Sequence, residues 1–306
     1  MRTCPVLANV RPMNSSTATT VFLPIALGVI MLGLGLSLTV GDFGRVLAYP
    51  RAAAVALGCQ ILVLPALCLG LVLLFDLEPA LAVGMMLLAA SPGGTTANLF
   101  SHLARGDVAL NITLTAINSV LAVVTMPVIV NLALDGFMKG EDAIGLQPAK
   151  LLQVFAIVLV PVAVGMVVRR RNPELADRLN RPVRIASVVV LVTVIAVAVY
   201  QERANVLGYL QAAGLVALIL CVLSLAIGYV APRAARVPRG QAVAASFEIG
   251  VHNSTLAITI ALSPALLNST EMAIPPAVYG ILSFLPAGLL AYAMSRRQDE
   301  QVEIRT

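Results

Sequence analysis

Apolar runs of membrane-spanning length recur along the chain, separated by short segments that contain Pro, Gly and charged residues. The hydrocarbon core of a bilayer is about 30 Å thick, so an α-helix needs about 20 mostly apolar residues to cross it. Nine runs reach or approach this length, at residues 20–40, 52–75, 80–104, 108–134, 150–168, 185–200, 206–230, 241–264 and 274–294. The sixth run is the shortest. The pattern predicts an all-α, polytopic membrane protein with nine transmembrane helices.

The composition of the chain supports this class and excludes others. Of 306 residues, 59% are hydrophobic and only 11% are charged, whereas soluble domains have about 25% charged residues. The net charge of +5 therefore indicates membrane topology rather than nucleic-acid binding. The four cysteines have no CxxC spacing, so we expect them to pack in the protein and not to form a metal site or disulfide.

The distribution of basic residues predicts the orientation of the chain. With the N-terminus outside, 15 of the 20 Lys and Arg residues fall in the inner segments, as the positive-inside rule requires. Residues 1–19 then form an extracytoplasmic segment, and 297–306 form a cytoplasmic tail. The chain has 18 Arg, 2 Lys and many Ala, which favours the inner membrane of a bacterium.

Two of the nine runs contain residues that interrupt helices. The third run includes Ser91-Pro92-Gly93-Gly94-Thr95-Thr96-Ala97-Asn98, and the eighth includes Glu248-Ile249-Gly250-Val251-His252-Asn253-Ser254. Proline removes a backbone donor and glycine weakens a helix. We predict helix breaks at Pro92, Gly93, Gly94 and Gly250. Broken backbone at bilayer depth is tolerated where it is buried in protein or lines a cavity.

Glu248 is the only charged side chain in the interior of these runs. A carboxylate at the centre of a bilayer costs about 3 kcal/mol or more. Because Glu248 also lies in an interrupted, polar stretch, the sequence predicts an ion-binding site there.

The two interrupted runs are five spans apart, so they cross the membrane in opposite directions. This arrangement is that of an inverted repeat of five spans per unit, with the first helix of the first unit missing. Interrupted segments at matching positions of two halves are typical of transporter binding sites. The alternative is that Pro and Gly only kink tightly packed helices.

Two blocks of the sequence resemble the bile acid:sodium symporter family. One is Ser91-Pro92-Gly93-Gly94 with Asn98, the Ala-Arg-Gly-Asp-Val-Ala-Leu segment at 104–110, and Thr115; the other is residues 247–254, and Gln60 followed by Pro65 is a third match. The resemblance extends over residues 21–294. It implies two crossing broken helices in a core domain (51–135 and 205–296), and a panel domain (20–50 and 148–204) that moves against the core.

The resemblance also implies two sodium sites, with no cofactor and no other metal. The first would use Asn98, Asn111, Thr115, Glu248 and the carbonyl of Ala97. The second would use Gln60, Glu248, the carbonyls of Ile249 and Val251, and His252. Oxygen ligands suit a hard cation such as sodium.

His252 departs from the family pattern, in which this position is usually glutamine. An imidazole nitrogen is a poor sodium ligand and binds a proton near neutral pH. Three roles stay open: hydrogen bonding that leaves a weaker sodium site, proton coupling in place of the second cation, or contact with the substrate. If the helix continued through His252, the side chain would lie one turn from Glu248 and could pair with it.

By the same resemblance, Thr95, Asn253 and Ser254 would contact the substrate. The helix N-termini at the two breaks favour an anion, so we expect a small organic anion, either a small carboxylate or a bile-acid-like compound.

The sequence therefore predicts a secondary active transporter that takes up an organic anion with sodium by alternating access. The alternative is a proton-coupled or efflux transporter of the same superfamily. No GxSxG or HExxH motif is present, so an enzyme is not expected. The predicted partners are the substrate, sodium and the lipid bilayer. The oligomeric state stays open, and a monomer is compatible with the sequence.

Overall fold

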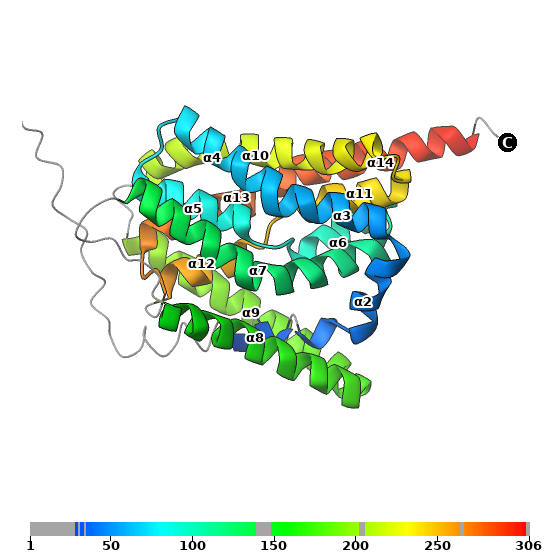
Figure 1. The fold of residues 1–306 in the computed structure, drawn as a ribbon, viewed down its shortest axis with the longest axis horizontal. Helices are drawn as coiled ribbons and strands as arrows, with labels where there is room; N and C mark the ends of the chain where they lie inside the picture. Colours follow the sequence, from blue (N-terminus) through cyan, green and yellow to red (C-terminus); the bar gives the residue numbers. More distant parts are fainter. Residues whose placement is uncertain are drawn as a thin grey trace, which may run out of the picture.

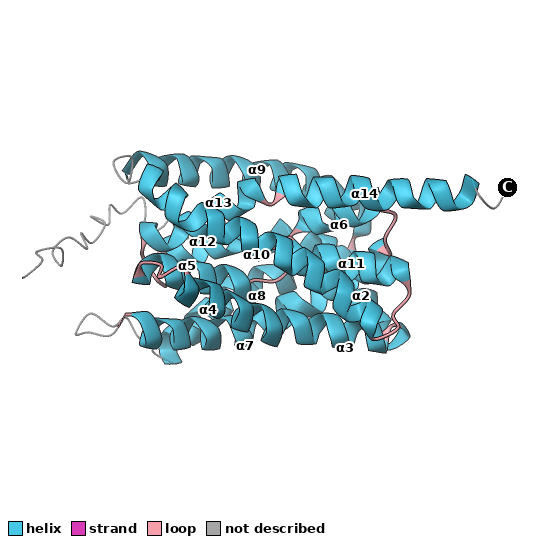
Figure 2. Cartoon of the chain, turned by 90° about the horizontal axis from the view of Figure 1, so that it is seen from above, coloured by secondary structure: helices cyan, strands magenta, loops and turns pink. Residues whose placement is uncertain are grey.

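The computed structural model describes residues 28–29, 31–33, 35–138, 148–201, 206–263 and 266–303, and these are helical apart from short turns and breaks. The α-helices are α2 (Val40–Gly44), α3 (Pro50–Gly58), α4 (Leu64–Leu74), α5 (Pro79–Ala90), α6 (Thr95–Leu103), α7 (Val108–Phe137), α8 (Pro148–Arg171), α9 (Pro173–Gln201), α10 (Val206–Ala234), α11 (Arg239–Gly250), α12 (Ser254–Leu262), α13 (Thr270–Leu282) and α14 (Phe284–Glu303). Most run along the long axis of the molecule (Figures 1 and 2). The predicted all-α class is confirmed. The predicted segment 1–19 and the start of the first apolar run lie outside the described residues.

Four helical segments of the described chain are long and apolar enough to cross a membrane. They are Pro50–Leu74, Val108–Phe137, Ala213–Ala234 and Thr270–Arg296. A fifth is possible if Met31–Ser37 and Val40–Ala48, which meet at a 74° bend, form one span. The short sixth run, 185–200, belongs to the longer helix α9. The part of α9 towards Pro173 is rich in charged residues, so the apolar pattern does not extend over it.

One π-helical turn, η2 (Cys59–Val63), joins α3 to α4. Pro65 explains this turn, because proline has no N–H to donate to the carbonyl four residues earlier and its ring clashes with that carbonyl. The wider turn carries Gln60, whose side chain is buried. The sequence thus uses one proline to present a polar side chain to the protein interior.

Four turns contain all of the non-glycine residues with positive φ in the described chain. The residues are Asp76 (48°), Arg105 (55°), Arg236 (59°) and Asn268 (47°). Asp76 and Arg236 each lie three residues before a helix, α5 and α11 respectively. Arg105 and Asn268 precede α7 and α13. Each of the two turns in the first half of the chain therefore has a counterpart with positive φ about 160 positions further along.

The helices that follow the second pair of turns begin in the same way. The Asp107 carboxylate accepts a hydrogen bond from Leu110 N at 3.0 Å, which caps α7. The Ser269 hydroxyl accepts one from Met272 N at 3.3 Å, which caps α13. Both are N-cap side chains of the preferred types.

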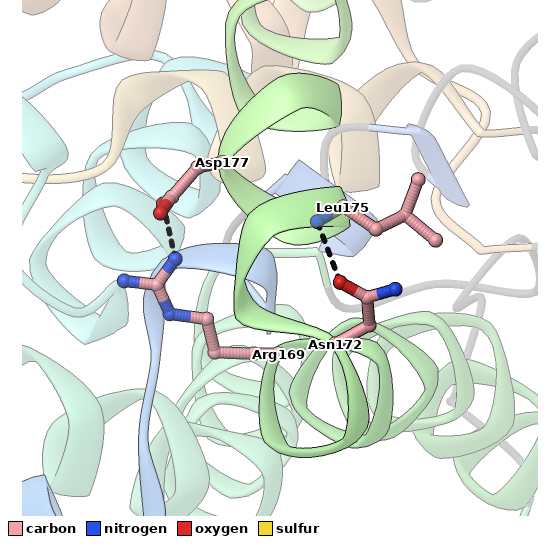
Figure 3. Close-up of polar contacts among 4 residues, drawn as sticks. All are labelled: Arg169, Asn172, Leu175 and Asp177. Atoms are coloured by element: carbon pink, nitrogen blue, oxygen red, sulfur yellow. Dashed lines mark hydrogen bonds and ion pairs between the residues drawn. The ribbon is translucent and has the colours of Figure 1, made fainter.

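Helices α8 and α9 lie together towards the lower edge of the bundle in Figure 1. Their junction is stabilised by side chains (Figure 3): Arg169 pairs with Asp177, and Asn172 Oδ1 accepts from Leu175 N at 2.9 Å. Asn172 thereby caps the start of α9. The ion pair is largely exposed, so we expect it to contribute little stability.

Candidate functional site

Two helical segments are each interrupted once, one between α5 and α6 and the other between α11 and α12. The two interruptions lie against each other. Gly93 and His252 form an isolated antiparallel bridge. Gly94 N donates to Val251 O at 2.6 Å, and Asn253 N donates to Pro92 O at 2.8 Å. Each break thus satisfies backbone groups of the other, as a buried, irregular backbone requires.

Glycine at position 93 allows this contact. A Cβ atom there would lie 2.3 Å from Cδ of Glu248 and 2.4 Å from both of its carboxylate oxygens. Any side chain at position 93 would push against the end of the Glu248 side chain. The predicted breaks at Pro92, Gly93 and Gly94 coincide with the interruption itself, whereas Gly250 is the last residue of α11 and the second interruption follows it.

The Glu248 side chain is 2% exposed and is held by two different parts of the chain. Gly93 N donates to Oε1 at 3.2 Å, and the Thr115 hydroxyl donates to Oε2 at 2.5 Å. Glu248 belongs to α11 and Thr115 to α7. The carboxylate therefore connects the second broken helix with α7 and with the first break.

Three buried carboxamide oxygens have no hydrogen-bond partner among the described residues: Oε1 of Gln60, Oδ1 of Asn98 and Oδ1 of Asn111. For Gln60 and Asn111, the hydrogen bond of the amide nitrogen fixes the orientation of the carboxamide group. Gln60 Nε2 donates to Ser91 O at 2.8 Å, and Asn111 Nδ2 donates to Ala244 O at 2.7 Å. A buried acceptor without a donor costs about 1–3 kcal/mol. A cation would satisfy it, so these residues fit a sodium ion.

The second break also changes the partners of three carbonyls. In a continuous α-helix Asn253 N would donate to the Ile249 carbonyl, but it donates to Pro92 instead. The described residues provide no other donor to Ile249 O. The Gly250 carbonyl accepts from the Tyr279 hydroxyl at 2.8 Å. Val251 O accepts from Gly94 and, like any carbonyl, has a second lone pair. The Ile249 and Val251 carbonyls are thus able to accept a cation.

His252 does not pair with Glu248. The helix ends at Gly250, so the spacing of one helical turn is lost between the two residues. Neither imidazole nitrogen has a hydrogen-bond partner of standard geometry among the described residues, although the ring lies near the Ser91 backbone, and it lies 5.3 Å from the ring of Tyr279. His252 is 4% exposed, so this polar ring is buried beside the break.

The predicted substrate residues have different surroundings. The Asn253 Oδ1 atom accepts from Leu256 N at 3.0 Å and caps α12, which leaves its NH2 group and one lone pair of the oxygen for a ligand. The Ser254 hydroxyl is buried, has no partner among the described residues, and faces Gly280 of α13. The Thr95 side chain lies outside the described residues. Ala97 is fully buried in the first turn of α6.

Sequence reasoning missed two polar side chains at this site. Tyr279, fully buried in α13, donates to the Gly250 carbonyl. Asn118 of α7 is 3% exposed and lies one helical turn beyond Thr115, which donates to Glu248. Asn118 follows Asn111 and Thr115 on one helical face, at spacings of four and three residues, and this periodicity could have revealed it. Tyr279 has no comparable sequence signal.

Comparison with known proteins assigns the chain to a family. A family model described as the sodium bile acid symporter family matches residues 24–209, more than half of the chain. The chain belongs to this family. The predicted resemblance is therefore confirmed, and the family is one of sodium-dependent membrane transporters.

Relatives within and outside bacteria cover most of the chain. An uncharacterized sodium-dependent transporter of Bacillus subtilis, YocS, is 27% identical over 281 residues, which cover 90% of this chain and 84% of the relative. A probable chloroplastic sodium/metabolite cotransporter of Arabidopsis thaliana, BASS1, is 26% identical, with 97% and 73% covered. Sodium/bile acid cotransporter 4 of Homo sapiens is 28% identical, with 90% and 64% covered. The members named here are said to transport metabolites or bile acids with sodium, or to depend on sodium.

Proposed function

We propose that the protein takes up a small organic anion by sodium-coupled, alternating-access transport. The observation that carries the proposal is the environment of Glu248. This buried carboxylate lies where two helix breaks hydrogen-bond to each other, and the predicted sodium ligands Gln60, Asn98 and Asn111 supply oxygens without donors. Sodium would bind between these oxygens and Glu248, and would connect η2, α6, α7 and α11.

Sodium binding would also prepare the site for an anion. Without a cation, the charge of Glu248 repels a substrate carboxylate at short range. With the cation bound, that repulsion is offset, and the N-termini of α6 and α12 present N–H groups and a positive dipole end. Coupling then follows from electrostatics, because the anion binds well only after sodium. A relative named as a sodium/metabolite cotransporter favours a small metabolic acid as the substrate class.

The architecture that we propose has nine spans, with the N-terminus outside and the C-terminus in the cytoplasm of a bacterium. The repeated turns at Asp76 and Arg236, and at Arg105 and Asn268, support an inverted repeat. Figure 1 supports the orientation, because the ends of α6, α8 and α14 and the starts of α3 and α11 lie on the same side of the molecule. These ends carry many of the basic residues that we expect on the inner side, among them Arg51, Arg105, Arg169, Arg239 and Arg296.

The test is transport in proteoliposomes. A panel of small carboxylates and one bile acid is first screened for thermal stabilisation of the purified protein with and without sodium, and the best compound is then used in uptake assays. An inward sodium gradient should drive accumulation, and choline should not replace sodium. Glu248→Gln should abolish sodium-driven accumulation, whereas Glu78→Gln, a change at an exposed carboxylate outside the site, should not. Accumulation by Glu248→Gln at the wild-type rate would refute the proposal.

A proton-coupled carrier is the second candidate, and His252 is the observation that favours it. Its ring is buried beside the break, and its nitrogens have no hydrogen-bond partner of standard geometry among the described residues; a proton bound there would supply positive charge in place of a second cation. Uptake that persists in choline and depends on an imposed pH gradient would favour this candidate over sodium coupling.

A further inference from the structure

Helix α7 presents three polar side chains to α11 along one face. Asn111, Thr115 and Asn118 are spaced by four and three residues, so they lie one above another on the helix. The first two contact α11 directly, because Asn111 Nδ2 donates to Ala244 O and Thr115 donates to Glu248. Asn118 is the third member of this polar row and is buried as deeply as the other two.

Asn118 lies one turn of α7 beyond Thr115, which donates to the Glu248 carboxylate, and its buried Nδ2 has no hydrogen-bond partner among the described residues. A buried amide N–H without an acceptor is costly. The acceptor beside it is an anionic oxygen, which forms stronger hydrogen bonds than a neutral one. An amide nitrogen cannot coordinate a cation, so Asn118 has a different task from the free oxygens of Asn98 and Asn111.

We propose that Asn118 is a positioning residue of the sodium site, whose amide N–H holds the Glu248 carboxylate in the orientation that binds the ion. This inference rests on the proposed sodium-coupled function. Gly93 N and the Thr115 hydroxyl each hold one carboxylate oxygen. In the ion-bound site Asn118 would add a third donor, from the next turn of α7. A carboxylate held by three donors loses little freedom when sodium arrives, and such preorganisation increases affinity.

The experiment measures sodium binding in the absence of any substrate. The purified full-length protein is titrated with NaCl against choline chloride at constant ionic strength, and the dissociation constant is taken from the rise in Tm, since a ligand that binds only the folded state stabilises it by mass action. Asn118→Leu keeps the approximate volume and removes the donor. We expect its sodium Kd to rise about tenfold. Asn118→Ser retains a hydroxyl donor and should recover much of the affinity.

Thr125→Val is the matched control on the same helix. The Thr125 hydroxyl donates only to Leu121 O, within α7, so its loss should leave the sodium Kd unchanged. The sodium-free Tm of each variant reports folding separately. If Asn118→Leu does not fold, the Asn118→Ser titration decides, with an expected Kd between those of the wild type and of the tenfold-weakened site.

The possible results separate this inference from the proposed function. If sodium does not stabilise the wild type, the sodium-coupled function itself fails. If sodium stabilises the wild type and Asn118→Leu equally, Asn118 does not position the carboxylate and the inference is overturned. A rise in sodium Kd shared by Thr125→Val would also overturn it, because the effect would then belong to α7 as a whole.

Discussion

Replacing Gly93 with alanine tests the site through a residue that is not itself a proposed sodium ligand. The added methyl group would lie 2.3 Å from Cδ of Glu248. Carbon atoms in contact lie about 3.5–4.0 Å apart, so the carboxylate or the break must move by about 1 Å or more. The backbone at Gly93 has a negative φ, which alanine adopts without strain. The methyl group is therefore the perturbation, not the backbone.

The size of the effect follows from the two hydrogen bonds that hold the carboxylate. A shift of about 1 Å would break or severely weaken the 2.5 Å bond from Thr115 and the 3.2 Å bond from Gly93. Hydrogen bonds to charged groups contribute about 1.5–3 kcal/mol each. If sodium binding depends on this orientation, the loss of about 3 kcal/mol corresponds to about a hundredfold rise in the sodium Kd.

The assay is the sodium titration of Tm described for Asn118, followed by sodium-driven uptake in proteoliposomes. Gly70→Ala is the control, because a Cβ at Gly70 of α4 would meet no atom within 4 Å. In a helix interior this change favours folding by up to about 1 kcal/mol. Gly70→Ala should therefore bind sodium like the wild type, and its Tm should not fall.

One result would refute the reasoning. If Gly93→Ala folds and binds sodium with the wild-type Kd, then either Glu248 moves without loss or it does not bind the ion. Uptake by this variant with the wild-type sodium dependence would lead to the same conclusion for transport.

Two further predictions concern the second break. Tyr279→Phe removes the hydroxyl donor to the Gly250 carbonyl and leaves it only the weak Cys221 thiol donor, at 3.7 Å. Tm should fall by a few degrees, since a buried carbonyl without a good donor costs about 1–3 kcal/mol; thermal unfolding of the sodium-free protein measures this, and an unchanged Tm would show that the thiol or water replaces the hydroxyl. His252→Gln supplies an oxygen in place of a nitrogen beside the first break and should lower the sodium Kd in the same titration at fixed pH. An unchanged Kd would mean that His252 lies outside the ion site.

Local features of the sequence predicted the all-helical class and the two interruptions, because they depend on neighbouring residues. Pro92 and its two following glycines break a helix wherever they occur in an apolar run. The cap of α12 by Asn253 could also be predicted from the sequence, since Asn is a preferred N-cap residue. The start of α9 was missed because its first turns are polar.

The contacts that make the site depend on residues far apart in the sequence, and a pattern along one segment does not contain them. The bridge between Gly93 and His252 joins two positions about 160 residues apart. The π-turn that carries Gln60 depends on Pro65 nearby, but its approach to the Ser91 carbonyl does not. Tyr279 is a single polar residue in an apolar run, and only packing brings it to the break.

The hydrogen bonds at the two breaks also argue for an order of binding. The bridge pairs the Gly94 and Asn253 N–H groups with carbonyls of the opposite break, and Gly93 N–H is taken by Glu248. Apart from the two His252 nitrogens, the groups left without a partner on the predicted ion ligands among the described residues are acceptors, namely three carboxamide oxygens and the Ile249 carbonyl. A cation satisfies several acceptors at once, whereas an anion would add negative charge to a site that already holds a carboxylate. Sodium should therefore bind before the substrate, and the organic anion should bind measurably only when sodium is present. Equal stabilisation by the anion with and without sodium would contradict this order.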